Sequence, residues 1–87
     1  MKWHLYIVKC CDGTLYTGIT TDIGRRIHEH NSTSKGAKYT RSRRPVELVY
    51  REDHIDRSSA SVAESRLKRL TRKEKLLIIS EYAKHVF

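Results

Sequence analysis

The amino-acid sequence predicts an α+β fold in which a three-stranded antiparallel sheet is flanked by helices. Three segments alternate apolar and polar residues with the period of a strand, and the turn signal Asp12-Gly13 separates the first two. Two later segments repeat apolar residues at helical spacing. The 87 residues are enough for one hydrophobic core and too few for two, so we expect a single compact domain over residues 1–87.

The first two strands are predicted at residues 3–9 and 14–19, and the turn between them decides which side chains share a face. A two-residue turn would place Tyr6 and Tyr16 on opposite faces. A three-residue loop with Gly13 in the left-handed conformation pairs Cys10 with Thr14 and places both tyrosines on one face. We predict this second register, because it alone gathers the apolar side chains on the other face: Leu5, Ile7, Leu15 and Ile19.

A helix is predicted to follow the second strand, because Thr21 or Asp22 can cap it. Within this helix Arg26 and His30 stand at i and i+4, and therefore lie one above the other on one face. The preceding strand presents Tyr16 to the same region. A phenol, a guanidinium and an imidazole that converge suit a phosphodiester, since a guanidinium offers a planar fork of donors to phosphate oxygens.

The second half of the chain predicts one more strand and two helices. Residues 46–51 alternate, with Val46 and Tyr50 expected on the same face. A helix is expected from about residue 56 or 58 to residue 70. Residues 71–74 carry a capping-box pattern, so another helix should begin there. We expect these two helices to cover the sheet.

The charge of the chain makes nucleic acid the first partner to consider. Eighteen Lys and Arg against ten Asp and Glu give a formal charge of +8. Several of these cations surround a tyrosine between residues 32 and 45, and we predict that this segment contacts the nucleic-acid backbone, although a solvated loop is the alternative for a charge run alone. The predicted contact residues are Lys35, Lys38, Tyr39, Arg41, Arg43 and Arg44.

The cysteines and the hydropathy indicate the compartment. Cys10 and Cys11 are adjacent, and no second pair exists that could complete a disulfide framework or a zinc site. No apolar run approaches the length of about 20 residues that a membrane span needs, and the first residues are too polar for a signal peptide. We expect a cytoplasmic protein with no membrane partner.

Hydrolysis of a phosphodiester needs a base for the attacking water and positive charge for the transition state. Arg26 can supply the charge. Tyr6 and Tyr16 can act as bases only if nearby cations favour the phenolate, and this chain has such cations. Glu64 is placed at the edge of an apolar helix stripe and could hold Mg²⁺, which needs only one or two protein carboxylates. The alternative for Glu64 is a surface carboxylate beside Arg66 and Lys68.

An ordered set of residues follows one pattern along the chain: Tyr6, Tyr16-Thr17-Gly18, Arg26, His30 and Glu64. This set resembles the motifs of the GIY-YIG nuclease superfamily, particularly its small single-domain bacterial members of uncharacterised function. The resemblance spans nearly the whole chain. It implies a divalent cation, Mg²⁺ or Mn²⁺, and cleavage of a phosphodiester. It also implies that Tyr6 is the general base, supported or replaced by Tyr16, that Arg26 contacts the phosphate, that Glu64 binds the metal and that His30 is an auxiliary group.

One departure from the family pattern keeps two functions open. Ile19 stands where well-studied catalytic members often carry Lys or another polar residue, and this removes one way of activating the base. We expect a metal-dependent endonuclease that acts on DNA rather than RNA and is directed by DNA structure, with a protein partner as one source of its specificity. The alternative is a non-catalytic nucleic-acid-binding module. A protein-binding scaffold would use Leu77 and Tyr82, which we expect instead in the core.

Overall fold

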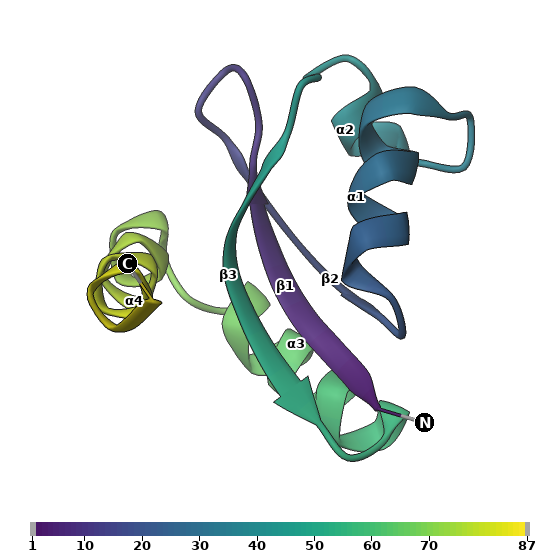
Figure 1. Ribbon diagram of the computed structural model, residues 1–87. Coiled ribbons are helices and arrows are strands. Elements are labelled where there is room, and N and C mark those ends of the chain that lie inside the picture. The colour runs from purple at the N-terminus through teal and green to yellow at the C-terminus, as the bar shows by residue number, and fades with distance from the viewer. Residues whose placement is uncertain (1, 87) are drawn as a thin grey trace.

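The computed structural model describes residues 2–86 and confirms the predicted fold class. The strand order is β2-β1-β3, with antiparallel neighbours. Figure 1 shows α1 and α2 on one side of the sheet and α4 on the opposite side. Within residues 2–86, no helix has the length and apolar character needed to cross a membrane. The elements are β1 (Trp3–Lys9), β2 (Leu15–Thr20), α1 (Ile23–Ser32), α2 (Lys38–Arg41), β3 (Glu47–His54), α3 (Arg57–Lys68) and α4 (Arg72–Val86).

The hairpin of β1 and β2 has the register that the apolar pattern predicts. The loop closes with a hydrogen bond of 2.8 Å from the Cys10 N–H to the Thr14 carbonyl, and Gly13 has a φ of 85°, in the left-handed region. Tyr6 is therefore opposite Gly18 in the ladder, while Tyr16 is opposite Val8. The two tyrosines share one face of the sheet, as predicted.

The two faces of the sheet bury two separate apolar clusters. On the face covered by α1, Tyr6 and Val8 pack with Cys10, Ile23 and Val46. On the other face, the cluster is formed by Leu5, Ile7 and Leu67, with half-buried neighbours from α3 and α4. Because β1 is the central strand and alternates, it supplies side chains to both clusters.

β3 differs from the prediction in its length and in its faces. It runs from Glu47 to His54, three residues beyond the predicted end. These last residues are polar and break the apolar alternation, but they still pair with β1 in the ladder, and the Asp53 carboxylate also lies 2.7 Å from Nδ1 of His4. The register shifts between Ile7 and Val8 of β1. This bulge moves Tyr50 to the cluster of Leu5 and Ile7, so the prediction that it shares a face with Val46 is wrong.

Polar side chains fix both ends of α1. The Asp22 carboxylate accepts a hydrogen bond of 3.0 Å from the Arg25 N–H and so caps the first turn. Near the other end, the Asn31 amide donates to the Val46 carbonyl at 3.1 Å and accepts from the Val46 N–H at 2.7 Å. The Asn31 side chain thus satisfies both backbone groups of Val46, the residue that precedes β3, as a neighbouring strand would. The helix is thereby held at a fixed position against the sheet.

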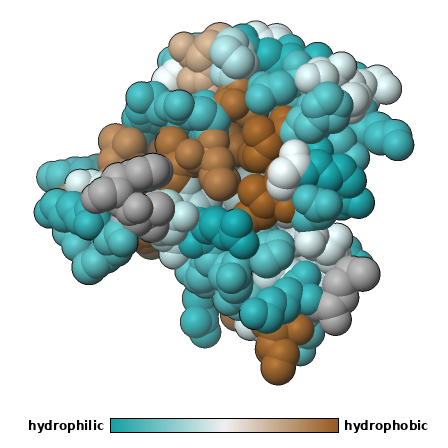
Figure 2. All heavy atoms as spheres, viewed as in Figure 1, coloured by the Kyte–Doolittle hydropathy of each residue, from teal (hydrophilic) through white to brown (hydrophobic). Residues whose placement is uncertain are grey.

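α4 begins at the predicted capping box, in which Thr71 and Glu74 each accept from the other's backbone N–H, at 3.2 and 3.0 Å. Tyr82 packs on Tyr50, with ring centroids 5.3 Å apart. Leu77, by contrast, is 62% exposed, so its predicted core position is wrong. In Figure 2, apolar side chains gather over the middle of the face shown, with hydrophilic side chains on both sides.

Candidate active site

A buried pair formed by Tyr6 and His30 lies at the centre of the site. The Tyr6 hydroxyl is 2.8 Å from Nε2 of His30, and the two residues are 1% and 0% exposed. Tyr6 comes from the middle of β1 and His30 from the last turns of α1. The half-buried ring of Tyr16 packs edge-on against the imidazole, with centroids 5.3 Å apart. Three of the predicted site residues are therefore in direct contact.

Gly18 allows the Tyr6 ring to lie across β2. A Cβ at position 18 would lie 2.5 Å from Oη of Tyr6 and 2.8 Å from its Cζ, far inside normal contact. The family motif places a glycine at this position, and the close approach of the phenol supplies the physical reason.

We expect Gly18→Ala to displace the Tyr6 ring from His30. Because the new methyl group overfills a packed site, it should lower the free energy of unfolding by about 1–3 kcal/mol. Any activity that depends on the Tyr6–His30 contact should fall by about 10-fold or more. Gly24→Ala is the matched control, since its Cβ would meet only the Asp22 carboxylate at 3.6 Å. Equal thermal stability and activity of Gly18→Ala and wild type would contradict the expectation.

Arg26 is held beside this pair by two hydrogen bonds. Its Nη1 donates to Oε1 of Glu29 at 2.9 Å and to the Lys35 carbonyl at 2.8 Å. Both bonds use the same nitrogen, and the side chain keeps 23% of its surface exposed. The guanidinium also lies beside the Tyr6 phenol, so a phosphate bound by its remaining N–H groups would lie next to Tyr6. Glu29 was not singled out from the sequence, although its i, i+3 spacing from Arg26 is a recognisable ion-pair signal.

Glu64 lies on α3, where that helix packs against β2 and β1. Its side chain is 24% exposed, and Oε2 is 3.5 Å from Nζ of Lys68. The carboxylate is near enough to Tyr6 for its charge to contribute to the raised pKa of that phenol. Glu64 therefore approaches Tyr6 from α3, whereas Arg26 approaches it from α1.

The donor set fits a hard cation that keeps most of its water. Within the described residues, no group of three or more His, Cys, Asp or Glu is placed to hold a metal. A zinc-type cage would require such a group, whereas Mg²⁺ binds through one or two carboxylates, waters and substrate phosphates. Glu64 alone meets that requirement, and Mn²⁺ accepts the same oxygen donors.

Burial sets the protonation states of the central pair. It raises the pKa of Tyr6 to about 12, although the Arg26 guanidinium opposes part of the rise. Burial also lowers the pKa of His30 to about 4, assisted by the positive charges of Arg26 and Arg44 and opposed by Glu29. At neutral pH the site therefore holds a neutral phenol hydrogen-bonded to a neutral imidazole, so the prediction that nearby cations favour the phenolate of Tyr6 is wrong: burial outweighs the charge of Arg26.

His30 should make the fold sensitive to mild acid. In the unfolded chain it protonates near its ordinary pKa of 6.5, whereas in the folded protein it does so only near 4. As the pH falls from about 6.5 to about 4, the unfolded state gains a proton that the folded state does not, so the free energy of unfolding decreases, by up to about 3 kcal/mol. Urea unfolding at pH 7 and pH 4.5 should show a smaller decrease in His30→Gln than in wild type; equal decreases would contradict this.

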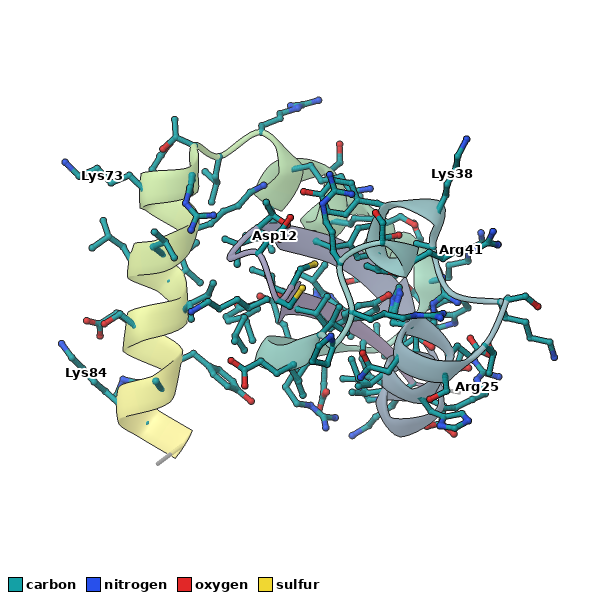
Figure 3. The ribbon with its side chains drawn as sticks, turned by 90° about the horizontal axis from the view of Figure 1, so that it is seen from above. Asp12, Arg25, Lys38, Arg41, Lys73 and Lys84 are labelled. Atoms are coloured by element: carbon teal, nitrogen blue, oxygen red, sulfur yellow. The ribbon has the colours of Figure 1, made fainter. Side chains whose placement is uncertain are left out.

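The predicted nucleic-acid contacts fall into two groups. Arg44 donates to three carbonyls at the end of α1, and Arg43 lies over the Tyr39 ring at 4.1 Å and pairs with Asp12 at 3.1 Å. Both are half-buried. Lys35, Lys38 and Arg41 are exposed, and Figure 3 shows Lys38 and Arg41 projecting from the α1–α2 side, away from the body of the protein.

α2 joins this basic surface to the buried pair. Tyr39 stacks on Tyr16 with centroids 5.9 Å apart. Thr40, which is fully buried, has its Oγ1 2.9 Å from Nδ1 of His30. The sequence offered no signal for this threonine, because α2 has four residues and only the folded chain brings it to the imidazole.

Ile19 occupies the position after the motif glycine, and its side chain packs in the cluster of Leu5 and Ile7. It lies on the face of the sheet opposite to Tyr6, because its ladder partner is Leu5. Residue 19 therefore does not reach the Tyr6 phenol, which is hydrogen-bonded to His30 instead.

Comparison with known proteins agrees with the resemblance to the GIY-YIG family. A sequence profile described as the GIY-YIG catalytic domain matches residues 2–77. A UPF0213 protein of Desulfotalea psychrophila is 65% identical over 91% of this chain and 74% of its own length. One from Staphylococcus epidermidis is 51% identical over 92% and 96%. The NMR structure of a UPF0213 protein from Bacillus halodurans matches at 42% identity with a TM-score of 0.59, over 92% of this chain and 84% of that one. An NMR structure from E. faecalis matches at 38% identity and a TM-score of 0.62, over 95% and 88%.

Proposed function

Because the chain belongs to the GIY-YIG family, we propose that it is a metal-dependent endonuclease that hydrolyses phosphodiester bonds in DNA, directed by DNA structure. The observation that carries the proposal is the buried hydrogen bond between Tyr6 and a neutral His30, with Arg26 and Glu64 near enough for their charges to act on the phenol. The exposed cations Lys35, Lys38 and Arg41 suit contacts to the backbone and shape of DNA, which carry no direct sequence information.

In this mechanism Tyr6 is the general base. As its oxygen takes a proton from the attacking water, its own proton passes to Nε2 of His30. Because the two transfers occur together, no free phenolate is formed. The water oxygen bonds to phosphorus while the bond to the leaving oxygen breaks. Arg26 donates to the phosphate oxygens, where negative charge accumulates. Glu64 would hold Mg²⁺ or Mn²⁺, and the cation would supply positive charge for the leaving oxygen.

The proposal is tested by cleavage of labelled branched, nicked and linear DNAs, and of matching RNAs, with Mg²⁺, Mn²⁺ or EDTA. We expect wild type to cut DNA with either metal and Tyr6→Phe to lose about 10²-fold or more of the rate. Tyr50→Phe is the matched control, because this phenol bonds to Glu52 at 2.6 Å in the cluster on the other face. A wild type that cuts none of the substrates, or an unimpaired Tyr6→Phe, would refute the nuclease.

A non-catalytic nucleic-acid-binding module is the second candidate. It is favoured by the internal pairing of the charged site residues, since Glu29 holds Arg26 and Lys68 holds Glu64. This candidate predicts binding without cleavage in every condition of the panel.

Both candidates predict binding that weakens with salt. If the exposed residues Lys35, Lys38 and Arg41 contact phosphates, the log of the duplex affinity should fall against log salt with a slope of about −3. A slope of about −4.5 would mean that Arg43 and Arg44 leave their internal partners and join them. Fluorescence anisotropy with labelled duplex between low and physiological salt measures the slope. A flat response would argue against both candidates.

A further inference from the structure

The arrangement of α2 bears on which nitrogen of His30 carries its proton. The imidazole has a partner at each nitrogen: the Tyr6 hydroxyl at Nε2 and Oγ1 of Thr40 at Nδ1. In the neutral ring one nitrogen donates and the other accepts. Tyr6 can pass its proton to His30 only if Nε2 is the acceptor. The partner at Nδ1 therefore decides whether the pair can work as a base.

The Thr40 hydroxyl has a second partner that takes its proton. Oγ1 lies 2.9 Å from the Ala37 carbonyl, which has no proton to give, so the hydroxyl donates there. The remaining lone pairs of Oγ1 face Nδ1 of His30, which must then carry the hydrogen. Nε2 is left bare and accepts from Tyr6. The hydrogen bonds run in one direction, from Tyr6 through His30 and Thr40 to the Ala37 carbonyl.

Packing alone gives no reason for a hydroxyl at position 40. Thr40 is 0% exposed, and a buried hydroxyl is unfavourable unless it is hydrogen-bonded, so valine would fill the same space without that penalty. The neighbouring Gly36 holds the segment close to α1, since a Cβ there would lie 2.6 Å from the Glu29 carbonyl. The close approach of Gly36 to α1 brings the Thr40 hydroxyl within hydrogen-bond distance of His30.

We propose that Thr40 is a positioning residue, which fixes His30 as the Nδ1–H tautomer and so makes Nε2 the proton acceptor for Tyr6. The inference rests on the proposed function for its catalytic consequence, whereas the tautomer itself can be observed without any substrate. Thr40 does not touch the reacting atoms. Its effect on the rate should pass entirely through the imidazole.

The test is ¹⁵N NMR of the imidazole at pH 7 in the free protein, for wild type, Thr40→Ser and Thr40→Val. We expect wild type and Thr40→Ser to carry the proton on Nδ1. Thr40→Val removes the acceptor at Nδ1, so its proton should shift toward Nε2. In cleavage assays Thr40→Val should lower kcat by about 10- to 100-fold with KM unchanged, and Thr40→Ser should restore it, because complete loss of a general base costs about 10²- to 10⁴-fold.

The outcomes separate this inference from the proposed function. An Nε2–H tautomer in wild type overturns the inference whether or not the protein cuts DNA, and this measurement needs no variant to fold. An unchanged Nδ1–H tautomer in a folded Thr40→Val overturns it equally. If the tautomers behave as expected and no protein cleaves, the assignment of Thr40 to His30 is supported and the nuclease proposal fails.

Discussion

Replacing Arg26 by alanine should lower the rate of phosphodiester cleavage by about 10³-fold or more while nucleic-acid affinity changes by a few-fold at most. The reason is that Arg26 lies beside the Tyr6–His30 pair, where its charge acts on the transition state, whereas the exposed cations Lys35, Lys38 and Arg41 supply most of the charge for binding. Single-turnover cleavage measures the first quantity and anisotropy the second. Arg26→Lys should recover part of the rate, since it keeps the charge and loses the planar donor fork.

Arg25→Ala is the matched control for this prediction. Arg25 is the preceding residue of the same helix, its side chain is 56% exposed, and it also pairs with Glu29, at 3.9 Å. Its loss removes the same charge without removing the group next to Tyr6, so cleavage should stay within a few-fold of wild type. If the two alanine variants lose activity equally, Arg26 has no special role and general attraction of the polyanion accounts for the effect.

Glu64→Gln should abolish metal-dependent cleavage, leaving less than about 1% of the wild-type rate, because the amide keeps the size of the side chain and removes the negative charge that attracts the cation. Titration with Mn²⁺ gives a second readout, since the paramagnetic ion should broaden NMR signals around Tyr6 in wild type and leave them sharp in the variant. Broadening that persists in Glu64→Gln would place the metal elsewhere.

Two further variants sharpen the assignment of Glu64. Glu81→Gln is the matched control, because Glu81 also pairs with a helix lysine, Lys84, at 3.3 Å, but on α4. It should cleave like wild type. Lys68→Ala removes the cation that pairs with Glu64 and should lower the metal concentration needed for half-maximal cleavage. A higher requirement in Lys68→Ala would mean that the lysine assists the metal site instead of competing with it.

The parts of the fold that depend on local chemistry could be predicted from the sequence. The face shared by Tyr6 and Tyr16 followed from hairpin parity, and the helix starts followed from capping residues such as Asp22 and Thr71. The bulge that turns Tyr50 to the other face could not be predicted, since it depends on how β3 meets β1 across more than 40 residues of sequence.

In the candidate site, too, the features set by local geometry could be predicted and those set by distant segments could not. Arg26 and His30 were placed together by helix geometry, which is local. Thr40 and Arg44 reach the site from outside α1, and their sequence neighbours identify them only as members of a basic loop. Arg44 satisfies carbonyls at the end of α1, a role that no charge pattern distinguishes from binding a phosphate. Hydrogen bonds between segments that are distant in the sequence therefore could not be predicted.

The position of α4 has a consequence for evolution and for engineering. It packs on β3, on the opposite side of the sheet from α1 and α2, and none of the proposed catalytic residues lies beyond Glu64 (Figure 1). Substitutions in α4 can therefore accumulate without changing the proposed catalytic residues. A targeting module joined to the end of α4 would leave the basic surface of α2 open to DNA, so specificity could be acquired by fusion or by a docked protein without redesign of the site.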